Sequence, residues 1–386
     1  MMTNDKNKKQ FDGVHYIDDG DAEWIAAGIL KEKTILKFIN FFNLQLDTRH
    51  YIDLLGTLKT VTELQAEILV PVFEQIFQNT SDGISASQVE SVDPKRAAVF
   101  ISNHRDIVLD SAVMNLILFR SGRRFANAGI GDNLLMNDAV QILFNMMKCF
   151  VIKRSLPGKK QVQFLRNLSD FIAFSTIEKN ESIWIAQASG RAKDGDDRTN
   201  PAVLKMLSMS KRTEAVERLQ ELNIHTTTCS YEWDPCDVFK VRELLTRNLG
   251  RPYQKQPNED MISIHAGICE SKGRVHVTFN RLSNNTVEAC RDLCDREFYA
   301  TLAGNIDAMI HRDYCLWPSN YIAADLLEES DRHSDSYTSD EKGFFLERMN
   351  KRLSGAYREP DLAAEAKKIY LTMYANPVYN NNKVAS

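Results

Sequence analysis

A histidine on a short polar turn is displayed in the way that is typical of a general base. An apolar run ends at Ser102, His104 stands on the turn, and apolar residues resume at Ile107. Asp106 and Asp110 follow closely enough to orient the ring. An imidazole exchanges a proton near neutral pH, and a neighbouring carboxylate can fix its tautomer. His104 is therefore the candidate base, and both carboxylates are candidate partners.

Three further polar clusters follow apolar runs later in the chain. The first is basic, the second combines basic residues with glycines, and the third is acidic. Arginine grips phosphate with two parallel donors, lysine adds a point charge, and glycine lets the backbone approach an anion. A single such residue after a strand is usually structural, so the prediction depends on the ordered set. The phosphate-binding candidates are Lys153, Arg154, Gly190, Arg191 and Lys193, and the acidic cluster holds Tyr231, Glu232 and Asp234.

Strand and helix patterns alternate through the middle of the chain and would position these clusters. The predicted strands are Ala97–Ser102, Cys149–Lys153, Ser182–Gln187, Thr226–Tyr231, Met261–Ala266 and Val275–Phe279. Helical patterns lie near 107–120, 136–147, 158–178, 201–222 and 235–248. This rhythm predicts an α/β fold, with a mixed, largely parallel sheet covered by helices. Loops at the carboxyl ends of neighbouring strands share one edge, so we expect the four clusters to line one crevice.

The ends of the chain are predicted to be helical additions to this α/β unit. We expect a flexible polar arm over 1–20, an N-terminal helical region over 21–90, the α/β domain over 91–285 and a C-terminal helical region over 286–380. Within the last part, helices are predicted near 287–309, 319–329, 340–353 and 361–374, and residues from Asn380 on are expected to be disordered. The basic amphipathic stretch Lys31–Phe42 is interpreted as a helix that faces the core, with a membrane-surface helix as the alternative.

Composition excludes several classes of protein. The chain has 386 residues, of which 43% are hydrophobic and 26% charged, so it can bury a core. Its net charge of −4 gives no indication of nucleic-acid binding. The seven cysteines are scattered without a CxxC pair, which indicates a reduced, cytoplasmic protein. No run approaches ~20 apolar residues, and the eight dispersed histidines form no evident metal-ligand set.

The four clusters, in this order, resemble the sequence blocks of the glycerolipid acyltransferase superfamily, which includes glycerol-3-phosphate and lysophosphatidate acyltransferases. The resemblance covers roughly 95–240. A further stretch, Ala126–Ile130, is similar to one in the bacterial glycerol-3-phosphate branch, and the chain is placed closer to that branch. The matching segments are Ser102–Arg105 with Asp110, Lys148–Arg154, Ser189–Gly195 and Thr226–Glu232.

The chain departs from the family pattern at two functional positions. The family places its aspartate five positions after the histidine, but Leu109 stands there and Asp110 is one position later. Asp110 can meet His104 only if the histidine precedes the helix. We favour Asp110 as the orienting carboxylate; Asp106 is the alternative, or it caps the helix that follows. The glutamate of the third block is also missing, because its candidate positions hold Gln187, Ala188 and Ser189.

The resemblance implies transfer of a fatty acyl group from acyl-CoA or acyl carrier protein to a hydroxyl of glycerol 3-phosphate or a related precursor. It implies His104 as base, Asp110 or Asp106 as its orienting carboxylate, and a phosphate clamp that includes Arg154, Arg191 and Lys193. No cofactor or metal is expected beyond the thioester donor, and the location is expected to be cytoplasmic, with a peripheral membrane contact as a candidate. Two alternatives stay open: a lyso-lipid acceptor, and an inactive relative that binds lipid or acyl-CoA.

Overall fold

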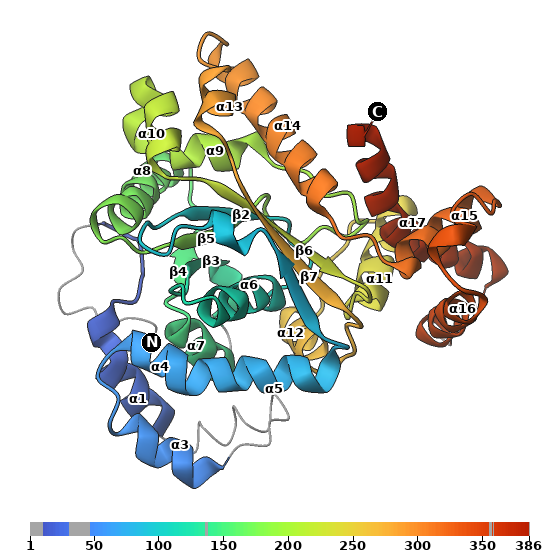
Figure 1. Cartoon of the computed structure of the whole chain (residues 1–386), viewed down its shortest axis with the longest axis horizontal. Coiled ribbons are helices and arrows are strands. Elements are labelled where there is room, and N and C mark those ends of the chain that lie inside the picture. Colours follow the sequence, from blue (N-terminus) through green and yellow to red (C-terminus); the bar gives the residue numbers. More distant parts are fainter. Residues whose placement is uncertain (1–10, 31–46, 136–137, 355–356, 358, 386) are drawn as a thin grey trace.

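A seven-stranded sheet forms the centre of the protein, which we describe from a computed structural model (Figure 1). The structure describes residues 11–30, 47–135, 138–354, 357 and 359–385. The strand order is β1-β7-β6-β2-β5-β3-β4. The run from β6 to β4 is parallel, whereas β7 is antiparallel to β6 and parallel to β1, so the sheet is mixed and largely parallel, as predicted. The strands are Ile84–Ser87 (β1), Val99–Ser102 (β2), Asn127–Gly131 (β3), Phe150–Ile152 (β4), Ile183–Ala186 (β5), His225–Tyr231 (β6) and Val275–Arg281 (β7).

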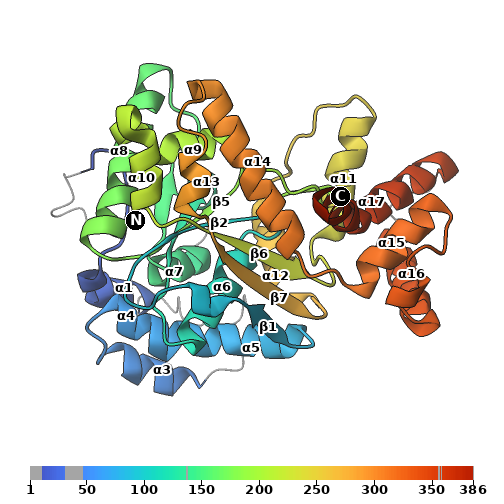
Figure 2. The same cartoon turned by 45° about the horizontal axis from the view of Figure 1, so that its top comes forward.

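Helices cover both faces of the sheet, and the alternation of strand residues explains why. Along β2, Ala98 and Phe100 pack into one core, whereas Val99 and Ile101 pack into the other. Successive side chains of a strand point to opposite faces, so a fully apolar strand needs cover on both. The first core contains α5 (Val70–Thr80), α6 (Leu109–Arg120), α7 (Asp138–Met146) and α12 (Glu259–Cys269). The second contains α8 (Lys159–Ala173), α9 (Pro201–Leu207), α10 (Ala215–Glu221), α13 (Asn284–Glu288) and α14 (Asp295–Asp313), seen above the sheet in Figure 2.

The N-terminal region packs onto both cores, with residues 11–16 on the second and Ile17 onwards on the first, and its start differs from our expectation. Phe11, Val14, Tyr16 and Ile17 are buried, so residues 11–20 are not a frayed arm but part of the packed structure. The apolar side chains in this segment, spaced among polar ones, fill gaps beside the sheet. The stretch Lys31–Phe42 lies outside the described residues. The elements here are η1 (Asp19–Asp21), α1 (Ala22–Leu30), α3 (Thr48–Leu55), α4 (Val61–Leu64) and the π-helical segment η3 (Gln65–Leu69).

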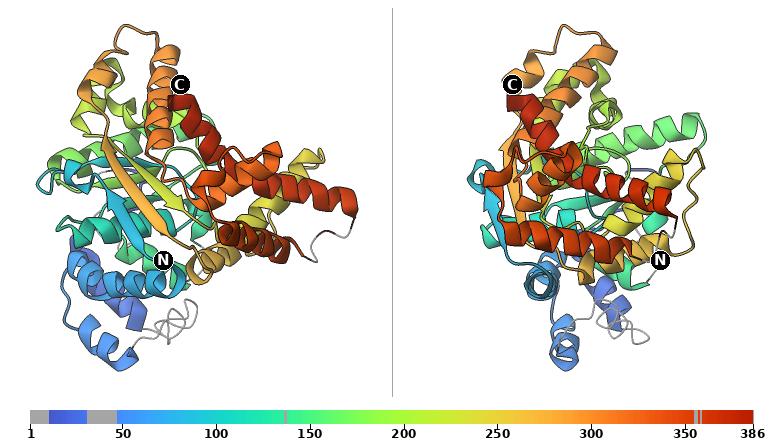
Figure 3. Two further views of the ribbon diagram at one scale, coloured as in Figure 1. Left: turned by 45° about the vertical axis from the view of Figure 1, so that its right-hand side comes forward. Right: turned by 90° about the vertical axis from the view of Figure 1, so that its right-hand side faces the viewer.

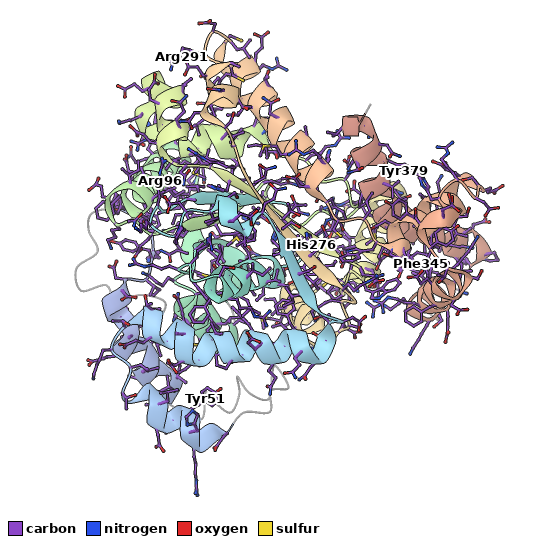
Figure 4. All side chains as sticks on the ribbon, in the orientation of Figure 1. Tyr51, Arg96, His276, Arg291, Phe345 and Tyr379 are labelled. Atoms are coloured by element: carbon purple, nitrogen blue, oxygen red, sulfur yellow. The ribbon has the colours of Figure 1, made fainter. Side chains whose placement is uncertain are left out.

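The C-terminal region builds a third core beside the carboxyl edge of the sheet (Figure 3). Figure 4 shows Phe345 and Tyr379 in this group of helices, away from His276 on the sheet and Tyr51 in the N-terminal region. The expected disorder after Asn380 is wrong, because the last helix continues to Ala385. The helices of this core are α11 (Asp237–Asn248), α15 (Pro318–Glu328), α16 (Ser339–Leu353) and α17 (Pro360–Ala385). The remaining short helical segments are η4 (Val89–Ser91), η5 (Asp132–Leu134), η6 (Phe174–Glu178), η7 (Met209–Glu214) and η8 (Ser334–Ser336).

One predicted strand is wrong, and two strands were not predicted. The stretch Met261–Ala266 alternates like a strand but lies within α12, where Ile264 and Ile268 bury one helical face. Acidic residues in the first turn of α12 favour the helix through its dipole. The strand β3 was not predicted because it holds two glycines, which are rare in strands. The strand β1 was not predicted because it is a short edge strand with two serines.

Candidate active site

His104 and Asp110 form a hydrogen-bonded pair at the end of β2. The distance from His104 Nδ1 to Asp110 Oδ2 is 2.9 Å. The histidine stands on the turn and α6 begins only at Leu109, so the carboxylate in its first turn can reach back. The histidine therefore precedes the helix, as the pairing of His104 with Asp110 requires, and the structure shows the pair that we favoured.

Asp110 is buried completely, and every donor around it holds its carboxylate in place. Its Oδ2 also accepts from the backbone nitrogens of Arg105 at 2.8 Å and Asp106 at 3.0 Å. Its Oδ1 accepts from the Tyr231 hydroxyl at 2.9 Å. Burial and the neighbouring Asp110 raise the pKa of Tyr231, which keeps that hydroxyl a donor. A carboxylate fixed by four donors holds the imidazole in one tautomer, with Nδ1 protonated and Nε2 free to accept.

Asp106 has the structural role of a helix cap. One of its oxygens accepts from the backbone nitrogens of Val108 and Leu109, each at 2.9 Å. A β-carbon at Gly267 would lie 2.4 Å from the other oxygen, so α12 closes over this side chain. Burial, followed by the charge of Asp110, raises the pKa of Asp106. The geometry therefore separates the two candidate carboxylates: Asp110 contacts the histidine and Asp106 starts the helix.

His104 opens onto a pocket of about 310 Å³ at the ends of β3, β4 and β5, which is also lined by residues of α6, α7, α8 and α9. Its ring packs edge-on against Trp184, with ring centroids 5.8 Å apart. Within the described residues, neither His104 Nε2 nor the buried indole nitrogen of Trp184 has a hydrogen-bond partner. Most of the lining is apolar and includes Ile107, Ile130, Leu134, Phe144, Met147, Ile152, Leu165, Val203 and Met206. In the described part of the chain, the imidazole of His104 thus has an unbonded Nε2 beside an apolar cavity of the size that binds small molecules.

Two of the predicted phosphate ligands line this same pocket. Lys153 and Arg154 follow β4 and belong to its wall. Arg154 is exposed and has no ion-pair partner among the described residues. A β-carbon at Gly131 would lie 2.9 Å from the Arg154 guanidinium carbon, so the guanidinium can occupy this position only because residue 131 is a glycine. Lys153 lies over the Phe164 ring, 5.8 Å from its centroid.

The other predicted ligands lie on the loop after β5, beside the histidine turn rather than in the lining of the pocket. The backbone nitrogen of Ala192 donates to the His104 carbonyl at 2.7 Å. Arg191 donates through Nη2 to Ser263 at 3.2 Å, while its buried Nη1 has no partner among the described residues. Lys193 pairs with Glu243 at 3.1 Å, and burial together with Arg191 lowers its pKa to about 8. Gly190 is exposed and adopts a φ of +87°.

The acidic cluster after β6 is structural, apart from Tyr231. Glu232 takes two hydrogen bonds from the Arg274 guanidinium, at 2.7 and 2.9 Å. Asp234 forms a buried ion pair with Lys240. The pocket is therefore lined by His104, by Lys153 and Arg154, and by the first residues of the loop after β5, Ala188 and Ser189. Tyr231 supports Asp110 from outside the lining.

Residues next to the histidine fix its turn, and sequence reasoning gave them no role. Asn103 donates to Cys229 O at 3.0 Å and accepts from Cys229 N at 2.8 Å, which ties the turn to β6. Arg105 pairs with Asp197 at 2.6 Å. Because both residues are adjacent to His104, a role in fixing the turn could have been suspected. Their partners lie more than 90 positions away in the chain, so the contacts could not be predicted.

With this geometry in view, the comparison with known families concerns the central segment of the chain. A family model described as Acyltransferase matches residues 83–231. This segment belongs to the acyltransferase family. The matched acyltransferase segment runs from just before β1 to the end of β6 and includes the dyad, Arg154, Arg191 and Tyr231. The resemblance to the acyltransferases noted in the sequence is thereby confirmed, whereas the assignment to the glycerol-3-phosphate branch stays a prediction.

A solved structure was found to be similar to this chain. It is the 1-acyl-sn-glycerophosphate (LPA) acyltransferase PlsC from Thermotoga maritima, with 12% identity and a TM-score of 0.36. The alignment covers 75% of this chain and 92% of the other. No curated protein matches the chain.

Two further facts concern the described residues, one about membrane-spanning helices and one about metal ligands. Within that part of the chain, no helix is long and apolar enough to cross a membrane. No group of three or more histidine, cysteine, aspartate or glutamate side chains is placed there to hold a metal ion.

Proposed function

We propose that the protein transfers a fatty acyl group from a thioester, acyl-CoA or acyl carrier protein, to a hydroxyl of glycerol 3-phosphate or a related phosphorylated acceptor. One observation carries this proposal: His104, whose Nε2 has no partner in the described part of the chain, lines an apolar pocket together with Arg154, which has no ion-pair partner there either. An apolar cavity suits an acyl chain, and a free guanidinium suits a phosphate. Together they would hold both substrates at one base.

In the proposed reaction, His104 Nε2 takes the proton of the acceptor hydroxyl while that oxygen attacks the thioester carbonyl. The tetrahedral centre collapses, the carbon–sulfur bond breaks, and the imidazolium returns its proton to the leaving thiolate. Asp110 stabilises the imidazolium without taking its proton, which is the role of the carboxylate in catalytic triads. No covalent acyl-enzyme is required.

Trp184 is the donor that we assign to the carbonyl oxygen as it becomes negative. Its indole nitrogen is buried without a partner among the described residues, and its ring contacts that of His104. A donor fixed by packing before the reaction stabilises a developing oxyanion at no cost of reorganisation. The side chain also belongs to the pocket wall, where the acyl group would lie.

The acceptor phosphate is assigned to Arg154 and Lys153, which share the pocket with the base. Arg191 and Lys193 lie on the other side of the histidine turn and would extend the positive field. Fixing the phosphate also fixes the hydroxyl near Nε2, and such positioning can supply a large part of a rate enhancement. A lysophosphatidate would present the same phosphate, so it is the alternative acceptor.

The decisive assay measures transfer from labelled acyl-CoA and acyl carrier protein to glycerol 3-phosphate and to lysophosphatidate. We expect activity with one acceptor that His104→Ala removes and that His50→Ala, a change at an exposed histidine on α3, leaves intact. Activity that survives His104→Ala would refute the mechanism. Binding of acyl-CoA without transfer would instead favour the inactive relative, which the missing glutamate near Ser189 suggests.

A membrane contact through Lys31–Phe42 is a second part of the proposal, with the protein on the cytoplasmic face. Deleting residues 1–46 is a poor test, because Phe11, Ile25 and Ile29 belong to the packed cores. Changing Lys31, Lys33 and Lys37 to glutamate keeps those side chains. We expect this variant to bind anionic vesicles less well in a sedimentation assay, and equal binding would argue against the contact.

A further inference from the structure

The loop after β5 carries Arg191 and Lys193 and has no regular structure of its own over residues 187–200. On the side of the sheet it is tied to the histidine turn. Arg105 donates to the carbonyl of Gly195 at 3.1 Å and to the Asp197 carboxylate at 2.6 Å. Further along the loop, α14 is also bonded to it: His311 Nε2 lies 2.6 Å from the Asp197 carbonyl, and the backbone nitrogen of Thr199 donates to Asp307 at 2.6 Å. Residues 194–196, next to Lys193, are held from another direction.

The last helix, α17, holds residues 194–196 with two asparagines. Asn376 donates to the carbonyl of Asp194 at 2.7 Å, one residue beyond Lys193. One turn later, Asn380 donates to the carboxylate of Asp196 at 3.0 Å. Side chains four positions apart lie on the same face of a helix, so both asparagines reach one loop.

The helix backbone itself touches the loop at Gly195. This residue has a φ of +78°, and a β-carbon there would lie 2.1 Å from the carbonyl oxygen of Met373. Only a glycine permits both the backbone conformation and this approach. The contact shows that the loop is seated against α17 rather than merely near it.

The same helix also reaches the histidine turn through a buried chain of polar contacts. The Tyr374 hydroxyl accepts from the backbone nitrogen of Asp234 at 3.0 Å. Asp234 pairs with Lys240, whose ammonium donates to the carbonyl of Arg105 at 2.8 Å. The helix α17 therefore contacts the loop with the basic residues directly, and it is linked to the turn with the base through Asp234 and Lys240.

A rigid setting holds α17 in place. Its Tyr370 and Tyr374 rings pack with Phe345 in the third core, and Asn320 donates to the Tyr374 carbonyl at 2.8 Å. Groups that orient a functional side chain are effective when their own rotamers are locked by packing. The C-terminal helices thus offer a fixed support for residues 194–196 of the loop.

We propose that α17 is a positioning element of the active site: Asn376 and Asn380 hold the loop so that Arg191 and Lys193 extend the positive field in which the acceptor phosphate binds. The part concerning the acceptor rests on the proposed function, whereas the coupling of helix and loop does not. The sheet-side ties remain when an asparagine is removed, so the loop would loosen without unfolding.

The test compares Asn376→Ala and Asn380→Ala with Asn382→Ala, a change at an exposed asparagine on the same helix. We expect the first two to raise the acceptor KM by about threefold to tenfold, the range that one hydrogen bond supplies. The donor KM should not change, and Asn376→Gln, which keeps the amide donor, should recover part of the loss. Unchanged acceptor KM, or an equal rise for donor and acceptor, would overturn the proposal.

Hydrogen exchange separates this proposal from the function on which it rests. Backbone amides of residues 188–199 should exchange faster in Asn376→Ala than in the wild-type protein or in Asn382→Ala. If the wild type transfers no acyl group but the loop still loosens, the proposed function fails and the coupling stands. If exchange in the loop is the same in all three proteins, α17 does not position it.

Discussion

Replacing Tyr231 by phenylalanine should expose how much the dyad depends on the support of its carboxylate. The change removes one of four donors to Asp110, the 2.9 Å bond to Oδ1, and keeps the buried ring. A hydrogen bond to a buried charged group contributes about 1.5–3 kcal/mol. We therefore expect the free energy of unfolding to fall by about 2 kcal/mol. The hole left by one oxygen atom is too small to add a large cavity penalty.

The effect on the rate should be smaller than the effect on stability. The bond from His104 Nδ1 to Asp110 remains, as do the two backbone donors to the same oxygen. We expect kcat to fall by less than about tenfold, which corresponds to about 1.4 kcal/mol. Removing the carboxylate with Asp110→Asn should cost far more, since the equivalent change in a serine protease triad costs about 10⁴.

Denaturant unfolding and single-turnover acyl transfer measure the two quantities separately. The control is Tyr253→Phe, which removes a hydroxyl that bonds to Glu259, outside the pocket lining. For Tyr231→Phe we expect a clear loss of stability with a fall in kcat of less than about tenfold. The reasoning is refuted if Tyr231→Phe is as stable as the wild type, or if it is as inactive as Asp110→Asn.

Three further predictions follow from single contacts, and a fourth from a shifted pKa. Trp184→Phe should lower kcat by about 10²–10³ with the donor KM little changed in steady-state kinetics; an unchanged kcat would remove the indole from the mechanism. Gly131→Ala should displace Arg154 and raise the acceptor KM, which the same assay would contradict if the value stayed constant. Gly267→Ala should destabilise the protein by about 1–3 kcal/mol in calorimetry, because its β-carbon would meet a buried carboxylate oxygen at 2.4 Å. Since burial lowers the pKa of Lys193 to about 8, its charge is present below that pH and lost above it. The acceptor KM of the wild type should therefore rise above about pH 8, whereas that of Lys193→Arg should stay flat, and parallel profiles would exclude this lysine.

The sequence was most informative where a side chain acts close to its own position in the chain. His104 and Asp110 are six positions apart, and the rule that a histidine before a helix can meet a first-turn carboxylate was enough to pair them. The support of that carboxylate by Tyr231, 121 positions away, depends on β6 lying beside β2. No local pattern encodes that neighbourhood.

The division of the basic residues into two groups has the same cause. Strand order places β3 between β4 and β5, so Arg154 and Arg191 do not follow adjacent strands. The strand β3 was not predicted because Gly129 and Gly131 lower the strand propensity of this segment. A β-carbon at either glycine would clash with a neighbouring side chain, so larger residues do not fit there. A site can thus weaken the very signal from which its supporting strand would be predicted.

The pairing of β1 with β7 has a consequence for the order of events during synthesis. Ser85 on β1 and Val275 on β7 are in contact across 190 positions of chain, and β7 alone joins β1 to the rest of the sheet. The ribosome must therefore release the chain beyond Arg281 before either strand can dock. Until then β6, which is buried along its whole length in the finished protein, presents an open edge to other nascent chains. A message truncated before this point should yield an aggregating product rather than a smaller enzyme.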